Sequence, residues 1–145
     1  MTIAILVKYF HYISIFILVA SVFCEFVLVK KALSRSEILR LSKIDMLYGL
    51  SSLAVVGFGF LLWLGVGKPA DFYSENPIFG VKVTLAILLG LFSIYPTVYF
   101  MKNRKGESNE VIETPKLVFY SIYAEFSLLI IIPFLATLMA NGIGL

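Results

Sequence analysis

The chain has 145 residues, of which 60% are hydrophobic and 14% are charged, and its formal net charge is +3. Soluble domains are about 45–50% apolar, so this composition excludes an ordinary water-soluble domain. The small positive charge does not indicate a nucleic-acid partner, because most of the basic residues gather in two short loops.

Four long apolar stretches predict membrane-spanning helices, because about 20 such residues cross the roughly 30 Å hydrocarbon core of a bilayer. In chain order they cover approximately 3–29, 47–66, 77–101 and 117–140. Backbone groups in hydrocarbon must pair within the protein, which favours helices packed as a bundle. We therefore predict one integral membrane domain, residues 1–145, that contacts membrane lipid and has an all-α fold, a four-transmembrane-helix bundle. The first stretch is expected to be a retained span, because the basic pair Lys30-Lys31 follows it.

The first span contains Lys8, the only histidine, His11, and the acid Glu25. His11 and Glu25 are fourteen residues apart, which places them on nearly the same helix face. Lys8 lies one turn before His11 and is expected either to share that face or to extend to the outer interface. Cys24 is expected to be a small buried apolar side chain.

Helix caps are predicted at two positions. The stretch "SRSEILRLSKID" offers Ser34 or Ser36 as an N-cap and extends the second helix beyond the membrane. Asn76 before Pro77 is a typical N-cap and first-turn pair for the third helix. Glycines in the spans are expected to allow close approach of helices; they are Gly49, Gly57, Gly59 and Gly90.

The basic residues predict the orientation. Nine of the twelve Lys and Arg lie between spans one and two or between spans three and four, which places both loops in the cytoplasm and both termini outside. The second of these loops, "NRKGESNEVIETP", is polar and expected to be mobile.

Polar residues toward the cytoplasmic side of the spans form one predicted cluster. It consists of Glu25, Asp45, Tyr48, Ser93, Tyr95 and Glu125. An acid inside the membrane needs a partner or a proton. Glu25 and Glu125 are therefore expected either to share a proton or to accept hydrogen bonds from tyrosines, and Asp45 either joins them or pairs with Lys43 or Arg40 at the membrane boundary.

A second predicted cluster lies toward the outer side. His11 is either a hydrogen-bonding group between helices or an axial ligand of haem iron. In the haem interpretation Lys82 and Lys8 would engage propionates, and Met139 would offer a second axial ligand. With one histidine, bis-histidine ligation within a single chain is excluded, and no cluster of residues predicts a metal site built from protein alone.

Several segments resemble an uncharacterised bacterial family of small four-span membrane proteins known only as a domain of unknown function. They are "LVKYFHYISIF", "SKIDMLYGLSSL", "NPIFGVKVTLAILLGLFSIYPTVYF" and "YAEFSLLIIIPFLATLMANGIG". The resemblance covers essentially the whole chain and implies a bacterial inner-membrane location, but it implies no activity. A more distant similarity, carried by Lys8, His11 and Lys82, is to CopD-like domains and HemJ-type membrane proteins; it implies haem b bound through His11.

Three hypotheses follow. The first is a redox protein that binds haem b through His11, with Tyr95, Glu25 and Glu125 as a proton path. The second is a small-solute or proton-coupled transport component, which would need a second copy or a partner because four spans are few for a transport route. The third is a structural subunit of a larger membrane complex. Enzymatic activity is left open.

Overall fold

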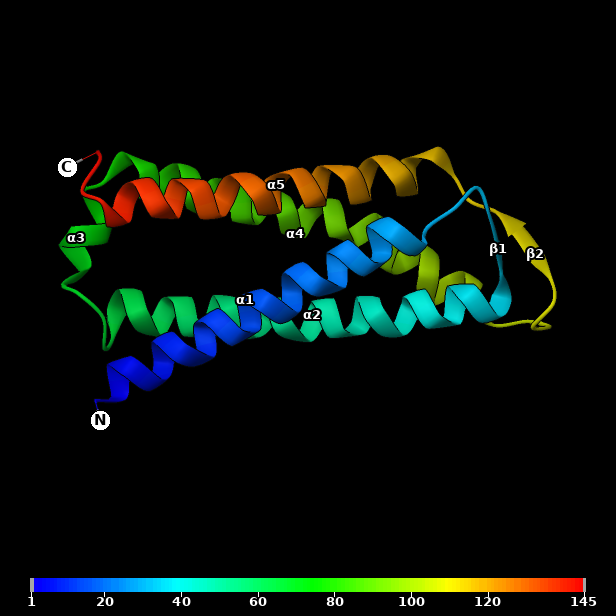
Figure 1. Ribbon diagram of the computed structural model, residues 1–145, viewed down its shortest axis with the longest axis horizontal. Helices are drawn as coiled ribbons and strands as arrows, with labels where there is room; N and C mark the ends of the chain where they lie inside the picture. The colour runs from blue at the N-terminus through cyan, green and yellow to red at the C-terminus, as the bar shows by residue number, and fades with distance from the viewer. Residues whose placement is uncertain (1, 145) are drawn as a thin grey trace.

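A computed structural model describes residues 2–144, and four long helices that lie lengthwise dominate it (Figure 1). They are α1 (Ile3–Leu28), α2 (Arg35–Leu64), α4 (Pro77–Asn103) and α5 (Lys116–Ala140). The shorter elements are α3 (Ala70–Ser74) and the strands β1 (Ala32–Ser34) and β2 (Val111–Glu113). Each long helix has the length and apolar composition to cross a membrane. The predicted all-α four-helix bundle is confirmed.

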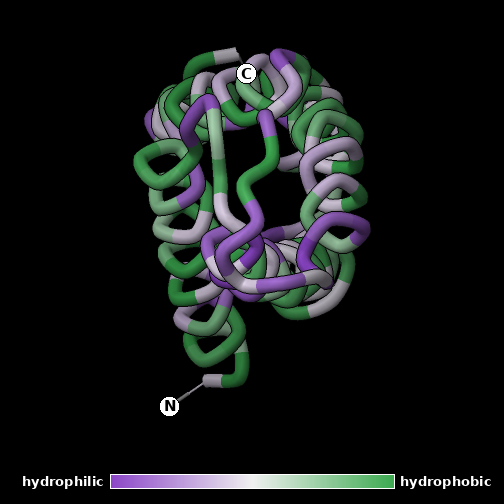
Figure 2. Tube along the Cα trace, turned by 90° about the vertical axis from the view of Figure 1, so that its right-hand side faces the viewer, coloured by the Kyte–Doolittle hydropathy of each residue, from purple (hydrophilic) through white to green (hydrophobic). Residues whose placement is uncertain are grey.

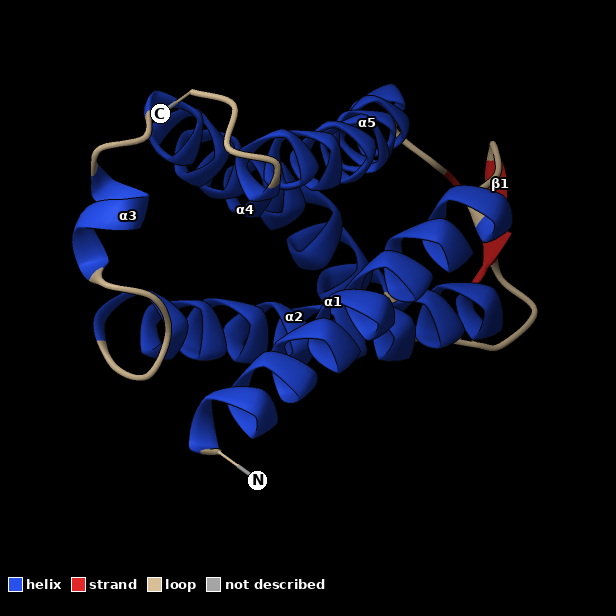
Figure 3. Cartoon of the chain, turned by 60° about the vertical axis from the view of Figure 1, so that its left-hand side comes forward, coloured by secondary structure: helices blue, strands red, loops and turns tan. Residues whose placement is uncertain are grey.

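The helices pack as two antiparallel pairs. The most extensive contacts join α1 to α2 and α4 to α5, and the pairs meet through α2 with α4 and through α1 with α5. Helix α1 crosses α2 obliquely, so its N-terminal end lies far from α5 (Figures 1 and 3). Figure 2 shows that apolar residues cover most of the length of the helices and that hydrophilic residues gather in the loops at the near end. Large apolar side chains such as Phe16 and Leu53 point outward, as expected for lipid-facing surfaces.

Two apolar clusters form the interior. The first lies toward the end of the bundle that carries the strands and consists of Val29, Leu33, Ile38, Leu41, Phe100, Val118 and Ile122. The second lies further along the bundle and consists of Leu18, Val22, Tyr48, Leu89 and Leu129. Cys24 belongs to neither cluster: the prediction that it is buried is wrong, because α1 turns this side chain outward beside the buried Glu25.

The strands define one end of the molecule, which we call the β end. There β1 and β2 pair antiparallel, with Leu33 opposite Ile112, and so join the α1–α2 loop to the α4–α5 loop. Arg35 strengthens this join: its Nε donates to Glu110 Oε2 at 3.1 Å and its Nη1 to the Asn103 carbonyl at 2.7 Å. The Arg35 guanidinium lowers the pKa of the Glu110 carboxyl below its usual range. The loop that was expected only to be polar and mobile therefore contains a paired strand.

Helix starts follow the predicted capping. Ser34 is the N-cap of α2, and its Oγ accepts a hydrogen bond from the Glu37 N–H at 3.2 Å. Asn76 is the N-cap of α4, and its Oδ1 accepts from the Ile78 N–H at 2.9 Å. The buried Asn76 also donates through Nδ2 to the Ile143 carbonyl at 3.2 Å, which ties the C-terminal turn to the start of α4.

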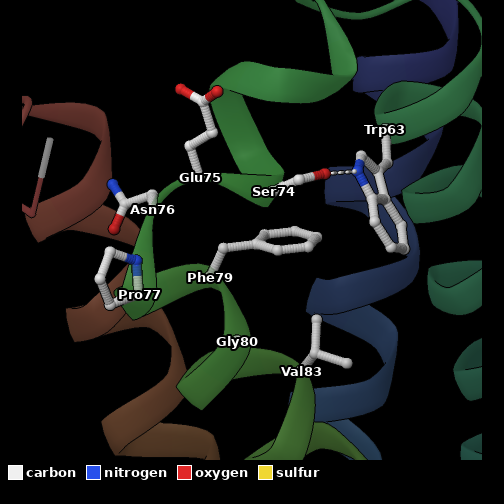
Figure 4. Close-up of a pocket in the computed structure, with 8 residues that line it drawn as sticks. All are labelled: Trp63, Ser74, Glu75, Asn76, Pro77, Phe79, Gly80 and Val83. Carbon is white, nitrogen blue, oxygen red and sulfur yellow. Dashed lines mark hydrogen bonds between the residues drawn. The ribbon is translucent and has the colours of Figure 1, made fainter.

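The opposite end, which we call the α3 end, carries α3 and both termini (Figure 1). A shallow pocket of ≈ 530 Å³ lies there between the end of α2 and the start of α4. Figure 4 shows the Phe79 ring directed toward Trp63, and the Trp63 indole N–H donates to Ser74 Oγ at 3.1 Å. Glu75 points away from the pocket, so the aromatic rings of Trp63 and Phe79, rather than a charged group, face it.

Candidate functional site

Three acids from three helices meet inside the bundle. Glu25 of α1 is 0% exposed, Asp45 of α2 is 5% exposed and Glu125 of α5 is 1% exposed. We call these residues the acid triad. Their positions in the helices explain their burial. Val29, Leu41 and Ile122, each one turn nearer the β end, belong to the first apolar cluster. Val22, Tyr48 and Leu129, one turn further on, belong to the second. The triad is thus a polar layer between two apolar layers.

The carboxyl groups of the triad interact with one another. The side chains of Glu25 and Asp45 lie close enough for the charge of Asp45 to act on Glu25, although no hydrogen bond joins them. Glu125 is close enough to both for their charges to interact. Carboxylates so close together inside the protein repel one another when ionised, which favours a proton on at least one of them.

Few donors satisfy these acids. Asp45 Oδ1 accepts a hydrogen bond from Thr97 Oγ1 of α4 at 3.0 Å. Both carboxylate oxygens of Glu25 and Oε1 of Glu125 are buried with no N–H or O–H donor from other residues. A buried ionised carboxylate without a donor or a cation is strongly unfavourable, so Glu25 is the member of the triad best placed to hold a proton.

None of the ion pairs in the described part of the chain involves the triad. The ion pairs of residues 2–144 are Lys30 with Glu37 at 2.8 Å and Arg35 with Glu110 at 3.1 Å, and both belong to the β end. Asp45 therefore does not pair with Lys43 or Arg40; it turns inward to Glu25 and Thr97. Within residues 2–144 no group of three His, Cys, Asp or Glu side chains has an arrangement suited to a metal ion.

Two predicted polar neighbours join the triad and one does not. Tyr48 is buried, lies close to Ser93 and is within the electrostatic range of all three acids. Ser93 Oγ donates to the Gly90 carbonyl at 2.6 Å. Tyr95 is 38% exposed on the outer surface of α4, because it lies two residues from both Ser93 and Thr97 and so faces the opposite side of the helix.

A groove connects the triad to the outer surface of the bundle. It lies between α2 and α4, has a volume of ≈ 410 Å³, and is lined on its polar side by Asp45, Tyr48, Ser93 and Thr97 among others. Arg104 stands toward the β end of the groove, where its Nη1 donates to Ser42 Oγ at 3.3 Å. Because Asp45 lines the groove and also lies close to Glu25, it stands between the surface and the two more deeply buried acids.

The outer cluster is only partly assembled. The His11 ring packs against α2, with its Cε1 3.4 Å from the position that a Cβ would take at Gly59, and its buried Nδ1 has no hydrogen-bond partner. Lys82 of α4 lies close enough for its charge to act on His11. Lys8 is exposed beside Tyr12, with Nζ 5.8 Å from the ring centroid.

Met139 is not brought to His11. It is buried in the last turn of α5, whereas His11 lies near the start of α1, and these two helix ends are on opposite sides of the molecule (Figures 1 and 3). The glycines in the spans were predicted to allow close approach of helices. Gly59 does so, because the His11 ring packs against it. The prediction is wrong for Gly49, Gly57 and Gly90, where an added Cβ would meet nothing within 4 Å.

Thr97 and Arg104 complete the site but were not among the predicted site residues. Thr97 follows Ser93 by four residues on α4, so the two hydroxyl groups share a face, and this spacing was a usable signal. Arg104 gave no such signal, because its role depends on the approach of α2 and α4 at Ser42.

Comparison with known proteins places the chain among membrane proteins. Residues 3–144 match the model of a family described as "Predicted membrane protein (DUF2214)". No curated protein and no solved structure matches the chain.

Proposed function

The chain belongs to the DUF2214 family of predicted membrane proteins, and we propose that it is a proton-coupled transport component whose acid triad binds and releases a proton. One observation carries the proposal: Glu25 is fully buried, has no hydrogen-bond partner for either carboxylate oxygen, and lies within the electrostatic range of two other acids. Intramembrane acids of this kind are typical of proton relays in pumps and transporters.

The geometry supports a route for the proton. Glu25 and Glu125 are enclosed between apolar clusters, while Asp45 also lines the α2–α4 groove. A proton that reaches Asp45 through the groove is close to Glu25 and passes on to it when the two carboxyl groups come within hydrogen-bond distance. Thr97 holds the Asp45 carboxyl in position for this transfer.

We place the β end in the cytoplasm of a bacterium and the α3 end on the outer side of the inner membrane. Nine of the twelve Lys and Arg lie in or beside the two loops at the β end, which is the distribution that the positive-inside rule describes for the cytoplasmic side. A continuous route across the membrane would need more than four helices, so we further propose that the working unit contains a second copy of the chain or a partner.

The test is infrared difference spectroscopy of the reconstituted protein during a pH titration. Protonated carboxylic acids have a distinct C=O stretching band, and we expect a band that shifts or disappears in Glu25→Gln. The matched control is Glu107→Gln, which removes an exposed acid from the α4–α5 loop. A titrating band that is identical in wild type, Glu25→Gln, Asp45→Asn and Glu125→Gln would overturn the proposal.

Haem b binding through His11 is a second candidate, favoured by one observation: the unpartnered Nδ1 of His11 lies near the cationic Lys82 of another helix. These two residues fit an iron ligand and a propionate partner, and a bound haem would supply electron transfer. The distant Met139 does not fit as a second ligand within one chain. Absorption spectra of the purified protein, oxidised and dithionite-reduced, test this candidate. A b-type spectrum that His11→Ala abolishes would support it, and a colourless protein after haem supplementation would eliminate it.

A further inference from the structure

We propose that the α2–α4 groove binds an amphipathic amine, a molecule with an ammonium group and an apolar body, whose ammonium group sits at Asp45 and displaces a proton from the acid triad. This inference rests on the proposed function and adds a substrate class to it. The groove volume of ≈ 410 Å³ lies within the range of about 300–1,000 Å³ typical of small-molecule sites.

Three hydroxyl groups of the groove offer acceptors rather than donors to an occupant. Ser52 Oγ donates to the Gly49 carbonyl at 2.8 Å, and Ser93 Oγ donates to the Gly90 carbonyl at 2.6 Å. Thr97 Oγ1 donates to Asp45 Oδ1 at 3.0 Å. Because each hydroxyl has a single hydrogen, these three side chains offer only oxygen lone pairs to an occupant. N–H donors on a ligand match this part of the lining.

The charges of the groove select a cation and orient it. Asp45 is the acid that lines it, with Glu25 and Glu125 directly behind, and Tyr48 is the nearby phenol. The one cation of the lining, Arg104, stands toward the β end. Repulsion from Arg104 therefore directs the ammonium group to Asp45 and the rest of the molecule away from the β end.

The apolar part of the groove suits the body of such a ligand. Its walls include Met46, Leu50 and Met101, and methionine side chains adapt readily to different apolar shapes. Gly49 also lines the groove, and a Cβ added there would meet nothing within 4 Å. This glycine leaves open the space that the ligand would occupy.

Binding of the ammonium group leaves the charge of the site unchanged if one proton leaves as it arrives. Glu25 is fully buried and its carboxylate oxygens have no hydrogen-bond partner, so without a nearby cation its protonated form is favoured. An ammonium group at Asp45 donates to the Asp45 carboxylate and brings a positive charge close to Glu25, which favours loss of the Glu25 proton to solvent through the groove. No bond other than the O–H bond is broken.

The test is isothermal titration of the full-length detergent-solubilised protein with 4-phenylbutylamine, in two buffers of different ionisation enthalpy. We expect binding with release of a proton, and no binding of 4-phenylbutanol. The trimethylammonium analogue, which has the charge but no N–H, should bind about tenfold more weakly or worse. Asp45→Asn should abolish amine binding, and Gly49→Leu should block it by filling the groove. Gly57→Leu, a change at an open glycine of the same helix outside the groove, should leave binding intact.

The titration results separate the inference about the groove from the proposed function. Failure of the amine to bind wild type, equal binding to Gly49→Leu, or binding without proton release overturns the inference. If the amine fails to bind but the carboxyl band of Glu25 still titrates, the proton-coupled function stands and the groove is not its substrate site. If the amine binds and the triad shows no titration, the proposed function fails instead.

Discussion

The Thr97–Asp45 hydrogen bond offers a direct measure of how firmly the acid triad is held. Thr97→Val keeps the shape of the side chain and removes the donor, which leaves Oδ1 of the buried Asp45 without a partner. An unsatisfied buried acceptor costs about 1–3 kcal/mol, whereas interhelical hydrogen bonds in membranes contribute about 0.6 kcal/mol on average and about 1.7 kcal/mol at most. Because the groove gives Asp45 some access to water, we expect a loss of about 1–1.5 kcal/mol.

The measurement is reversible unfolding in mixed micelles by SDS titration, followed by far-ultraviolet circular dichroism. Thr84→Val is the matched control: it lies on the same helix, is exposed, and its hydroxyl bonds to the Gly80 carbonyl of its own helix at 2.9 Å. Its substitution should change the free energy of unfolding by less than about 0.5 kcal/mol. A Thr97→Val loss no larger than that of Thr84→Val would refute the account of how Asp45 is positioned.

Three further predictions concern the frame around the site. Phe100→Ala, which empties a fully buried position of the first apolar cluster, should lower the free energy of unfolding by about 3–5 kcal/mol in the same SDS titration, whereas Phe16→Ala, 67% exposed, should cost far less. Asn76→Ala removes a helix cap and the tie to the C-terminal turn, and should cost about 1–2 kcal/mol, with faster amide exchange confined to the α3 end. The pKa of Glu110 is lowered in the folded protein, so its pairing with Arg35 stabilises the fold at pH values above 4.5, the ordinary pKa of glutamate. This contribution is lost as the pH falls through the folded-state pKa. Glu110→Gln should therefore reduce the difference in stability between neutral and acidic pH, and an unchanged pH profile would contradict the pairing.

The sequence was sufficient for features that depend on one helix at a time. Apolar length predicted the four long helices, and the capping residues Ser34 and Asn76 predicted where α2 and α4 begin. The depth of Glu25 and Glu125 followed from the rise per residue, and the structure brings them together with Asp45.

Features that depend on how helices approach one another were harder to predict. Distance along a helix fixes the depth of a residue in the membrane but not its position around the bundle, so Met139 seemed a partner for His11 although the oblique α1 carries His11 away from α5. The β1–β2 pairing joins segments almost eighty positions apart in the chain, and neither three-residue strand shows an alternating pattern long enough to predict it. The outward position of Tyr95, by contrast, was readable from its offset to Ser93 and Thr97.

The β1–β2 ladder gives the two helix pairs a common fulcrum. It fastens the α1–α2 pair to the α4–α5 pair by backbone hydrogen bonds at one end, while at the other end the covalent link through α3 is the long connection between α2 and α4. If the pairs rock about this fulcrum, displacement grows with distance from it. The acid triad lies near the fulcrum, so the movement would displace it little and the Thr97–Asp45 hydrogen bond would persist. His11 and Lys82 lie further from the fulcrum, so the same movement would widen the distance between them more. A rocking motion of this kind would leave the acid triad intact while it changes access from the α3 end.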